Sequence, residues 1–232
     1  MRKPVVSEAF IYMRTIILNM DGEFYDMHVA CDDIDMIKEL GFKGACTFSD
    51  REPKHLEGFD VFRGIEIEAS NMADLKRVAL VRKNFDVVLV NAREIDILRK
   101  AVRVKDVDVV HVGTKEGVID HIIAKDASAN KTFIEFRLSD MLNFYANHRA
   151  RIFRNLVFNA KMIKKYSTPF VITSGAREKW ELRGVGELIA FAVALGFQPN
   201  EAKAGLQRLS ELIKIRKSKG YVADGIIVED KK

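Results

Sequence analysis

The chain has 232 residues, of which 48% are hydrophobic and 31% charged, and its formal net charge is +5. This length suits one globular domain with a substantial core, and no Ser/Gly-rich linker divides the sequence. No apolar run reaches the roughly 20 residues of a membrane helix, and the first residues lack the apolar segment of a signal peptide. Cys31 and Cys46 stand alone in apolar runs, as free thiols do in a reducing compartment. We therefore expect a single cytoplasmic domain over 1–232, with 220–232 as a candidate flexible C-terminal tail and no membrane partner.

Short runs rich in Val, Ile and Phe recur along the chain, and a helical pattern follows most of them. The expected strands are Phe24–Val29, Gly44–Phe48, Val61–Glu68, Phe85–Val90, Val107–Val112, Thr132–Phe136 and Pro169–Thr173. The expected helices are Asp32–Leu40, Asn71–Lys83, Arg93–Val102, Gly117–Lys125, Ser139–Tyr166, Glu187–Leu195 and Glu201–Lys219, with Ser139 and Asn200 capping two of them. This alternation predicts an α/β fold, a distorted (β/α) TIM-like barrel of about seven parallel strands. A doubly wound open sheet is the alternative.

Few residues at the expected strand ends, where barrel enzymes have their active sites, could catalyse a reaction or bind a metal. Asp26 and His28 belong to the first strand and Glu66 to the third, and such side chains can bind zinc, manganese or iron. The chain has five histidines and no His-x-His pair, and no GxSxG, HExxH, P-loop or GxGxxG motif occurs. His111, within Val-Val-His-Val, fits a hydrogen-bonded core histidine better than a metal ligand. We therefore predict no catalytic residue, and Asp26, His28 and Glu66 are candidates only for a vestigial metal site.

Positive charge is concentrated in the last third of the chain. Residues 145–183 contain nine Lys/Arg and two acids, and residues 203–219 contain six Lys/Arg and one acid. These segments carry +7 and +5, so the rest of the chain carries −7 to reach the total of +5. Such segregation is typical of a protein that binds a polyanion, although a solvated Lys-rich surface would look similar.

The expected long helix places its cations on one side. At 100° per residue, Arg151, Arg154, Lys161 and Lys165 share a face about 80° wide. No acid is interleaved with them, so this face differs from a helix surface covered by salt bridges. It suits a phosphate backbone, where each contact releases a condensed counterion. A solvated basic face is the other interpretation.

The segment after the seventh expected strand, VITSGAREKWELR, combines small residues with three cations and the only Trp. Arg177, Lys179 and Arg183 would stand at the carboxyl end of the sheet. An arginine can fork onto phosphate oxygens or stack on a base. Trp180 could stack on an unpaired base, although a packing role that anchors the loop is the commoner use of such a residue.

From about Val88 to Leu209 the sequence resembles the 30-kilodalton ribonuclease P subunit family, which includes archaeal ribonuclease P protein component 3. The resemblance is carried by Gly117-Val118-Ile119-Asp120-His121-Ile122-Ile123-Ala124-Lys125, Phe136-Arg137-Leu138, the basic helix, Thr173-Ser174-Gly175-Ala176, Glu178-Lys179-Trp180-Glu181-Leu182-Arg183 and Glu201-Ala202-Lys203-Ala204. Each motif alone is weak, and the ordered set is specific.

The resemblance implies a fold similar to the polymerase and histidinol phosphatase superfamily of metal hydrolases. Asp26-x-His28 and Gly64-x-Glu66 match that superfamily. At the seventh strand, however, those hydrolases have metal ligands where this chain has Ser174-Gly175-Ala176 followed by cations. Fewer ligands mean weaker metal binding. A stand-alone metal-dependent phosphoesterase is therefore the alternative function and not the leading one.

The resemblance implies a protein subunit of a ribonucleoprotein enzyme, in which RNA removes the 5′ leader from precursor tRNA. The expected partners are the ribonuclease P RNA, protein component 2 and the other protein subunits, with precursor tRNA as the substrate of the complex. The RNA uses Mg²⁺, and the protein itself binds no cofactor. The matching positions predict RNA contacts at Arg137, Lys179, Arg183 and Lys203, and also at Lys125 and Lys161.

Overall fold

The computed structural model describes residues 22–49, 55–112, 117–218, 221–223 and 226–227. Seven strands form one sheet whose order follows the chain, and all neighbouring strands are parallel. They are β1 (Tyr25–Val29), β2 (Gly44–Thr47), β3 (Asp60–Ala69), β4 (Val87–Ala92), β5 (Val109–Val112), β6 (Phe133–Arg137) and β7 (Phe170–Thr173). Each expected strand is confirmed to within a few residues.

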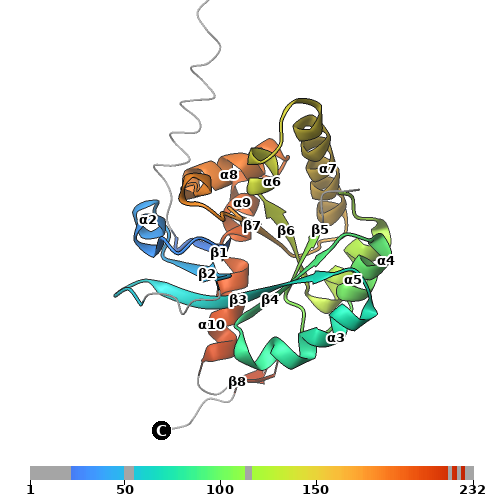
Figure 1. Cartoon of the computed structure of the whole chain (residues 1–232), viewed down its shortest axis with the longest axis horizontal. Coiled ribbons are helices and arrows are strands. Elements are labelled where there is room, and N and C mark those ends of the chain that lie inside the picture. Colours follow the sequence, from blue (N-terminus) through green and yellow to red (C-terminus); the bar gives the residue numbers. More distant parts are fainter. Residues whose placement is uncertain (1–21, 50–54, 113–116, 219–220, 224–225, 228–232) are drawn as a thin grey trace, which may run out of the picture.

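The sheet curls until its two edges meet. Val29, at the end of β1, forms a parallel bridge with Ala176, just after β7. The Ala176 carbonyl accepts hydrogen bonds from the backbone N–H groups of Ala30 at 2.8 Å and Cys31 at 3.2 Å. The predicted distorted (β/α) barrel is thereby confirmed, and an open doubly wound sheet is excluded (Figure 1).

Helices surround the barrel (Figure 1). They are α2 (Ile34–Glu39), α3 (Met72–Val81), α4 (Ile95–Ala101), α5 (His121–Asn130), α6 (Ser139–Leu142), α7 (Ala146–Lys165), α8 (Val185–Ala194), α9 (Pro199–Gly205) and α10 (Arg208–Lys217), with short 3-10 turns η1 (Arg82–Asn84) and η2 (Lys179–Glu181). No helix in the described ranges is long and apolar enough to cross a membrane. Beyond α10, β8 (Tyr221–Ala223) and β9 (Ile226–Ile227) pair in antiparallel fashion; most of the expected tail 220–232 lies outside the described residues.

Three predicted helices have other boundaries in the structure. The helix expected over Gly117–Lys125 is α5, which begins at His121 after the cap Asp120 and continues to Asn130. The helix expected over Ser139–Tyr166 is two helices, because the backbone of Tyr145, the N-cap of α7, is extended (φ −128°, ψ 160°) and interrupts it. Ser139 is the first residue of α6 and does not cap it. The helix predicted to start after Asn200 instead begins at Pro199, with Gln198 and Glu201 forming the capping box. It also ends early, since the Leu206 carbonyl accepts the Tyr25 N–H of β1 at 3.1 Å.

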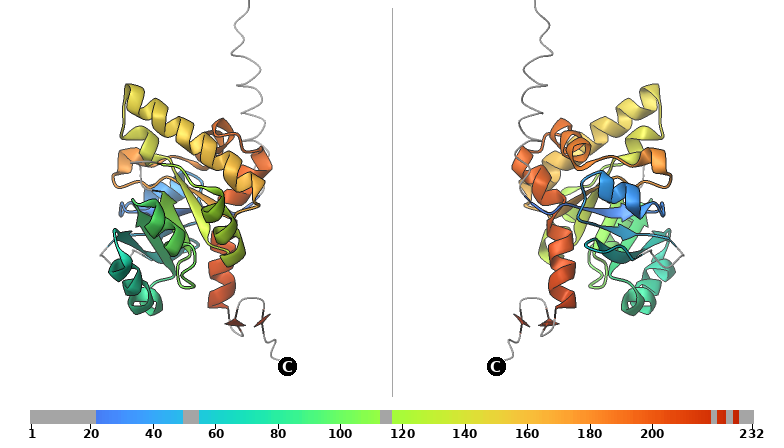
Figure 2. Two further views of the ribbon diagram at one scale, coloured as in Figure 1. Left: turned by 90° about the vertical axis from the view of Figure 1, so that its right-hand side faces the viewer. Right: turned by 90° about the vertical axis from the view of Figure 1, so that its left-hand side faces the viewer.

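The barrel interior is apolar toward the amino ends of the strands. The buried inner residues are Tyr25, Met27, Cys46, Phe62, Val87, Leu89, Val109, Phe133 and Val171. Leu209 and Ile213 of α10 pack against them and close this end of the barrel. Figure 2 shows α10 at the end of the molecule opposite to the start of α7. Polar residues of the interior are therefore left for the carboxyl end, where α7 begins.

Candidate functional site

Successive side chains of a strand point to opposite faces, so every second residue of a barrel strand points inward. On β6, Phe133 lies in the inner core, and the same row continues through Glu135 to Arg137. The corresponding rows of β3, β4, β5 and β7 reach Glu66, Asn91, His111 and Thr173. The carboxyl end of the barrel interior is therefore a cluster of polar side chains above an apolar floor.

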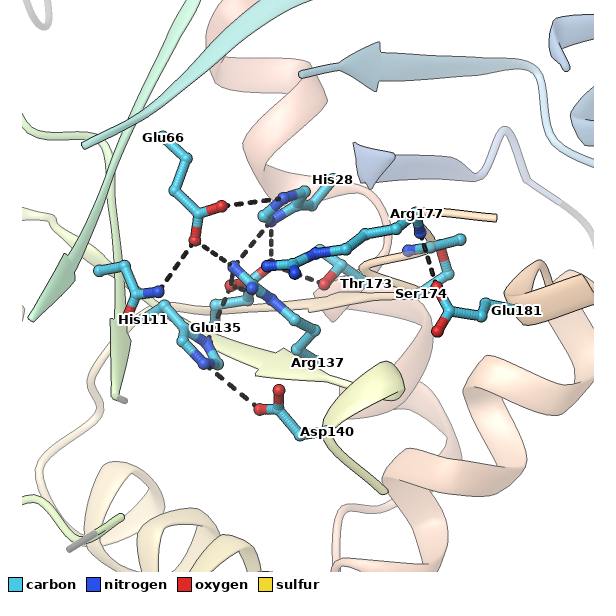
Figure 3. Close-up of polar contacts among 12 residues, drawn as sticks. His28, Glu66, His111, Glu135, Arg137, Asp140, Thr173, Ser174, Arg177 and Glu181 are labelled. Atoms are coloured by element: carbon cyan, nitrogen blue, oxygen red, sulfur yellow. Dashed lines mark hydrogen bonds and ion pairs between the residues drawn. The ribbon is translucent and has the colours of Figure 1, made fainter. Parts of the chain in front are cut away.

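Arg137 occupies the middle of this cluster (Figure 3). Its side chain is only 5% exposed. Nη2 donates to Glu135 Oε2 at 2.8 Å and to Glu66 Oε1 at 3.0 Å, while Nε donates to Glu135 Oε2 at 3.1 Å. One guanidinium thus neutralises carboxylates from two different strands.

Histidines surround the Arg137–Glu135 pair. His28 Nδ1 lies 2.8 Å from Glu135 Oε1, which also accepts a hydrogen bond from Thr173 Oγ1 at 2.7 Å. His111 Nδ1 lies 3.0 Å from Glu135 Oε2, and its Nε2 lies 3.3 Å from Asp140. These contacts complete a polar network that joins β1, β5, β6, β7 and α6.

Charge inside the network shifts several pKa values. Burial alone would raise the pKa of Glu135, but Arg137 and His28 hold it well below its ordinary value. Glu66 follows the same pattern, with its pKa lowered chiefly by Arg137 against the effect of burial. Burial raises the pKa of Asp140, and His111 and Arg137 oppose this only in part. The carboxylates nearest to Arg137 are thus held ionised by it.

Gly175, in the segment after β7, makes room for Arg137. Its φ of +61° lies in the left-handed region, and a Cβ there would overlap Cγ and Cδ of Arg137. A glycine at position 175 is therefore required by the arginine that packs against it.

Asp26 is fully buried and serves the same segment. Its Oδ1 accepts hydrogen bonds from the backbone N–H groups of Ser174 at 3.1 Å and His28 at 3.3 Å. Its Oδ2 has no hydrogen-bond partner among the described residues. Burial raises the pKa of Asp26 to about 7. Of the three candidate metal ligands, His28 and Glu66 approach each other, with Nε2 and Oε2 4.0 Å apart, whereas Asp26 supports the β7 turn.

The residues do not fit the metal site of a hydrolase. Within the described ranges, no group of three or more His, Cys, Asp or Glu is arranged to hold a metal ion. The cation that meets Glu135 and Glu66 is a guanidinium of the chain itself. Arg137 was predicted only as an RNA contact, and its pairing with Glu135 was missed. The signal was the opposite charge of two residues that stand two positions apart in an apolar strand.

The predicted RNA-contact residues lie in different surroundings. Arg151, Arg154, Lys161 and Lys165 are all exposed on α7, which has six cations and no acid in twenty residues. Lys125 of α5 is also exposed, and its Nζ and that of Lys165 lie 5.6 and 5.5 Å from the Tyr166 ring. These five cations thus remain on the surface.

The remaining candidates are distributed over the β7 loop, α9 and the interior. Lys179 is exposed on η2, and Lys203 is half-buried on α9. Arg183 donates from Nη1 to the carbonyls of Trp180 and Leu182, both at 2.7 Å, so it holds the η2 turn. Arg137 is the one predicted contact that is buried.

A cavity of about 600 Å³ opens over the polar cluster. Its charged lining consists of Arg93, Arg137, Arg151 and Arg177 against Glu68 and Asp140. We call this the carboxyl-end cavity. It brings the start of α7 together with the segment after β7.

The fold and the site define a (β/α) barrel with an arginine at the centre of the polar cluster at its carboxyl end. A family model described as RNase P subunit p30 matches residues 23–219. The chain belongs to this family, which confirms the sequence resemblance and makes it a protein subunit of ribonuclease P.

The relatives agree with this assignment. A Ribonuclease P protein component 3 from Methanosarcina mazei is 31% identical, over 89% of this chain and 95% of its own length. A Ribonuclease P protein component 3 from Methanococcoides burtonii is 30% identical, over 89% of this chain and 94% of its own length.

Solved structures support the fold. A chain in the cryo-EM structure of archaeal Ribonuclease P with mature tRNA is similar at a TM-score of 0.74 and 24% identity, over 90% of this chain and all of that one. A Xaa-Pro dipeptidase shares the fold at a TM-score of 0.61 and 12% identity, over 88% of this chain and 78% of that one.

Proposed function

We propose that this subunit binds the RNA of ribonuclease P through α7 and neighbouring cations, and that it stabilises the active fold of that RNA. The observation that carries the proposal is the exposed face of Arg151, Arg154, Lys161 and Lys165 on a helix without a single acid. A partner with regularly spaced negative charge suits such a face, and a phosphate backbone has that property.

The physical mechanism is charge neutralisation by fixed cations. RNA helices that pack together repel each other through their phosphates, and Mg²⁺ normally screens that repulsion. Lysines and arginines on a rigid barrel do so without having to be recruited from solution, and each contact releases a counterion. The RNA then needs less Mg²⁺ to reach its active fold.

Further RNA contacts are proposed around this face. Lys125 extends it beyond Lys165, because both lie beside the Tyr166 ring. Lys179 of η2, Arg183 just after η2 and Lys203 of α9 are further proposed contacts. Arg137 lies in the carboxyl-end cavity with its guanidinium paired, so RNA would reach it only by entering that cavity.

Catalysis is assigned to the RNA and to its Mg²⁺, and the chain is proposed to act as one cytoplasmic barrel domain with a C-terminal tail. The pairing of Arg137 with Glu135 and Glu66 supports this assignment over a stand-alone phosphoesterase, since these carboxylates are already neutralised. Protein component 2 is the proposed direct protein partner, and precursor tRNA the substrate of the assembled enzyme.

Reconstitution tests the proposal. Ribonuclease P RNA and component 2 are assayed for precursor-tRNA cleavage over a range of Mg²⁺, with the full chain, without it, or with a variant carrying Arg151→Gln, Arg154→Gln, Lys161→Gln and Lys165→Gln. We expect the native chain to lower the Mg²⁺ requirement and the variant to lose most of this effect. Arg77→Gln, which removes an exposed cation of α3, is the control. An unchanged Mg²⁺ requirement with the native chain would refute the proposal.

A further inference from the structure

We infer that the carboxyl-end cavity binds one unpaired nucleotide of RNA, with its phosphate against the arginines and its base against an aromatic pair. This inference rests on the proposed RNA binding and adds a specific contact to it. The cavity volume of about 600 Å³ lies within the range of roughly 300–1,000 Å³ that is usual for small-molecule sites. A recess of this size differs from the convex face of α7, which can contact only the outside of an RNA helix.

The phosphate side of the site is formed by Arg93, Arg151 and Arg177, which come from three separate segments. Figure 3 shows the Arg177 side chain extending from its loop toward the His28–Arg137 cluster. Its guanidinium has no hydrogen bond or ion pair within the part of the chain described. Arg151 Nη2 lies 3.2 Å from His148 Nε2, which holds this guanidinium at the cavity wall. Arg93 is paired with Glu68 at 3.1 Å and Arg137 with Glu66 and Glu135. The remaining charges of the lining are Arg151 and Arg177 against Asp140, so the excess positive charge comes from these two arginines.

The base side of the site is formed by Phe144 and His148. Their rings stack with centroids 4.4 Å apart and an interplanar angle of 20°, and both residues line the cavity. A flat aromatic surface beside guanidinium groups is the combination that recognises an unstacked base. The cavity thus offers a stacking surface as well as positive charge.

An unpaired nucleotide fits these features better than a duplex or an acidic protein segment. A base held in a duplex is covered on both faces, so it cannot stack on the Phe144–His148 pair. An acidic side chain would satisfy the arginines but would leave the aromatic surface unused. The stacked pair is therefore the observation that favours RNA.

Binding of a short RNA to the isolated full-length chain tests the inference. The probe is a fluorescein-labelled uridine trinucleotide, measured by fluorescence anisotropy at low salt, with an RNA duplex of equal charge as competitor. We expect Arg177→Gln to weaken trinucleotide binding about tenfold, as for a lost charge-assisted contact with phosphate. Phe144→Leu should weaken it about fivefold through lost stacking. Arg77→Gln, the same substitution on exposed α3, should leave binding unchanged.

Because Phe144 is half-buried, Arg177→Gln decides the outcome if Phe144→Leu does not fold. Equal effects of Arg177→Gln and Arg77→Gln, or full competition by the duplex, would overturn the inference. Loss of component 2 binding in Arg177→Gln, with trinucleotide binding intact, would assign the cavity to a protein segment and overturn it as well. Binding of ribonuclease P RNA is measured in parallel: if that RNA binds and the trinucleotide does not, the inference fails while the proposed function stands.

Discussion

The Arg137 guanidinium donates to Glu135 Oε2 at 2.8 Å, from a position two residues further along the same strand. Both side chains point into the barrel, where Glu66 is the second carboxylate bound to Arg137. A cation that belongs to the chain itself thus stands between carboxylates of two strands of the barrel. The cation holds strand ends together and cannot leave.

Arg137→Met should destabilise the chain by about 3–5 kcal/mol, because Glu135 would be left buried without its partner. Urea denaturation measures this loss. Combining the substitution with Glu135→Gln should recover part of it, since the uncompensated charge is removed. A loss below about 1 kcal/mol in the single variant, the range of an exposed ion pair, would show that the pair is solvated.

Gly175→Ala should destabilise the chain more than Gly58→Ala. Both glycines have positive φ, +61° and +70°, so both substitutions introduce backbone strain. Only at Gly175 would the new Cβ overlap Arg137, whereas nothing lies within 4 Å at Gly58. The difference in unfolding free energy between the two variants isolates this overlap. Equal losses would mean that Arg137 moves aside freely.

Asp26→Asn should flatten the pH dependence of stability. The folded-state pKa of Asp26, about 7, lies above its ordinary value of 3.8, so its contribution is full below pH 3.8 and is lost as pH rises through 7. As pH rises from 4 to 8, the unfolding free energy of the variant should therefore increase relative to that of the native chain, by up to about 4 kcal/mol. Unfolding free energies across this range provide the test, with Asp106→Asn as control. A constant difference between Asp26→Asn and the native chain would contradict the raised pKa.

Dialysis against a chelator should leave thermal unfolding of the native chain unchanged. The carboxylates of Glu66 and Glu135 are already neutralised by Arg137, so a metal ion is not needed for their burial. Differential scanning calorimetry before and after dialysis measures the effect. A fall in the melting temperature that added Mn²⁺ or Zn²⁺ reverses would contradict this account.

The barrel was predictable from the sequence because its strands are short, continuous apolar runs at regular spacing. The helix boundaries were harder to predict from the sequence, since some of them depend on contacts with distant parts of the backbone. Leu206, at the end of α9, accepts a hydrogen bond from the Tyr25 N–H of β1. This contact leaves no local signal in the sequence, because Tyr25 stands far earlier in the chain.

The polar cluster was predictable only in part. Glu66 stands on the inward row of β3, and its Oε2 lies 4.0 Å from His28 Nε2. Strand alternation places Tyr25 and Met27 of β1 inward, so His28 is not expected in the interior; the pairing of β1 is irregular between Asp26 and Val29. The link from Arg137 to Glu66 spans 71 residues and requires the register of β3, β4, β5 and β6, which periodicity alone does not specify. The need for a glycine at position 175 could not be predicted either, because it depends on the position of the Arg137 side chain.

The most direct test of RNA binding by α7 is the salt dependence of ribonuclease P RNA affinity. The dissociation constant is measured between about 50 and 200 mM salt for the native chain and for the variant with Arg154→Gln and Lys161→Gln. If both residues contact phosphates, the slope of log affinity against log salt should become shallower by about two. An unchanged slope in a folded variant would contradict a phosphate-binding role for this helix.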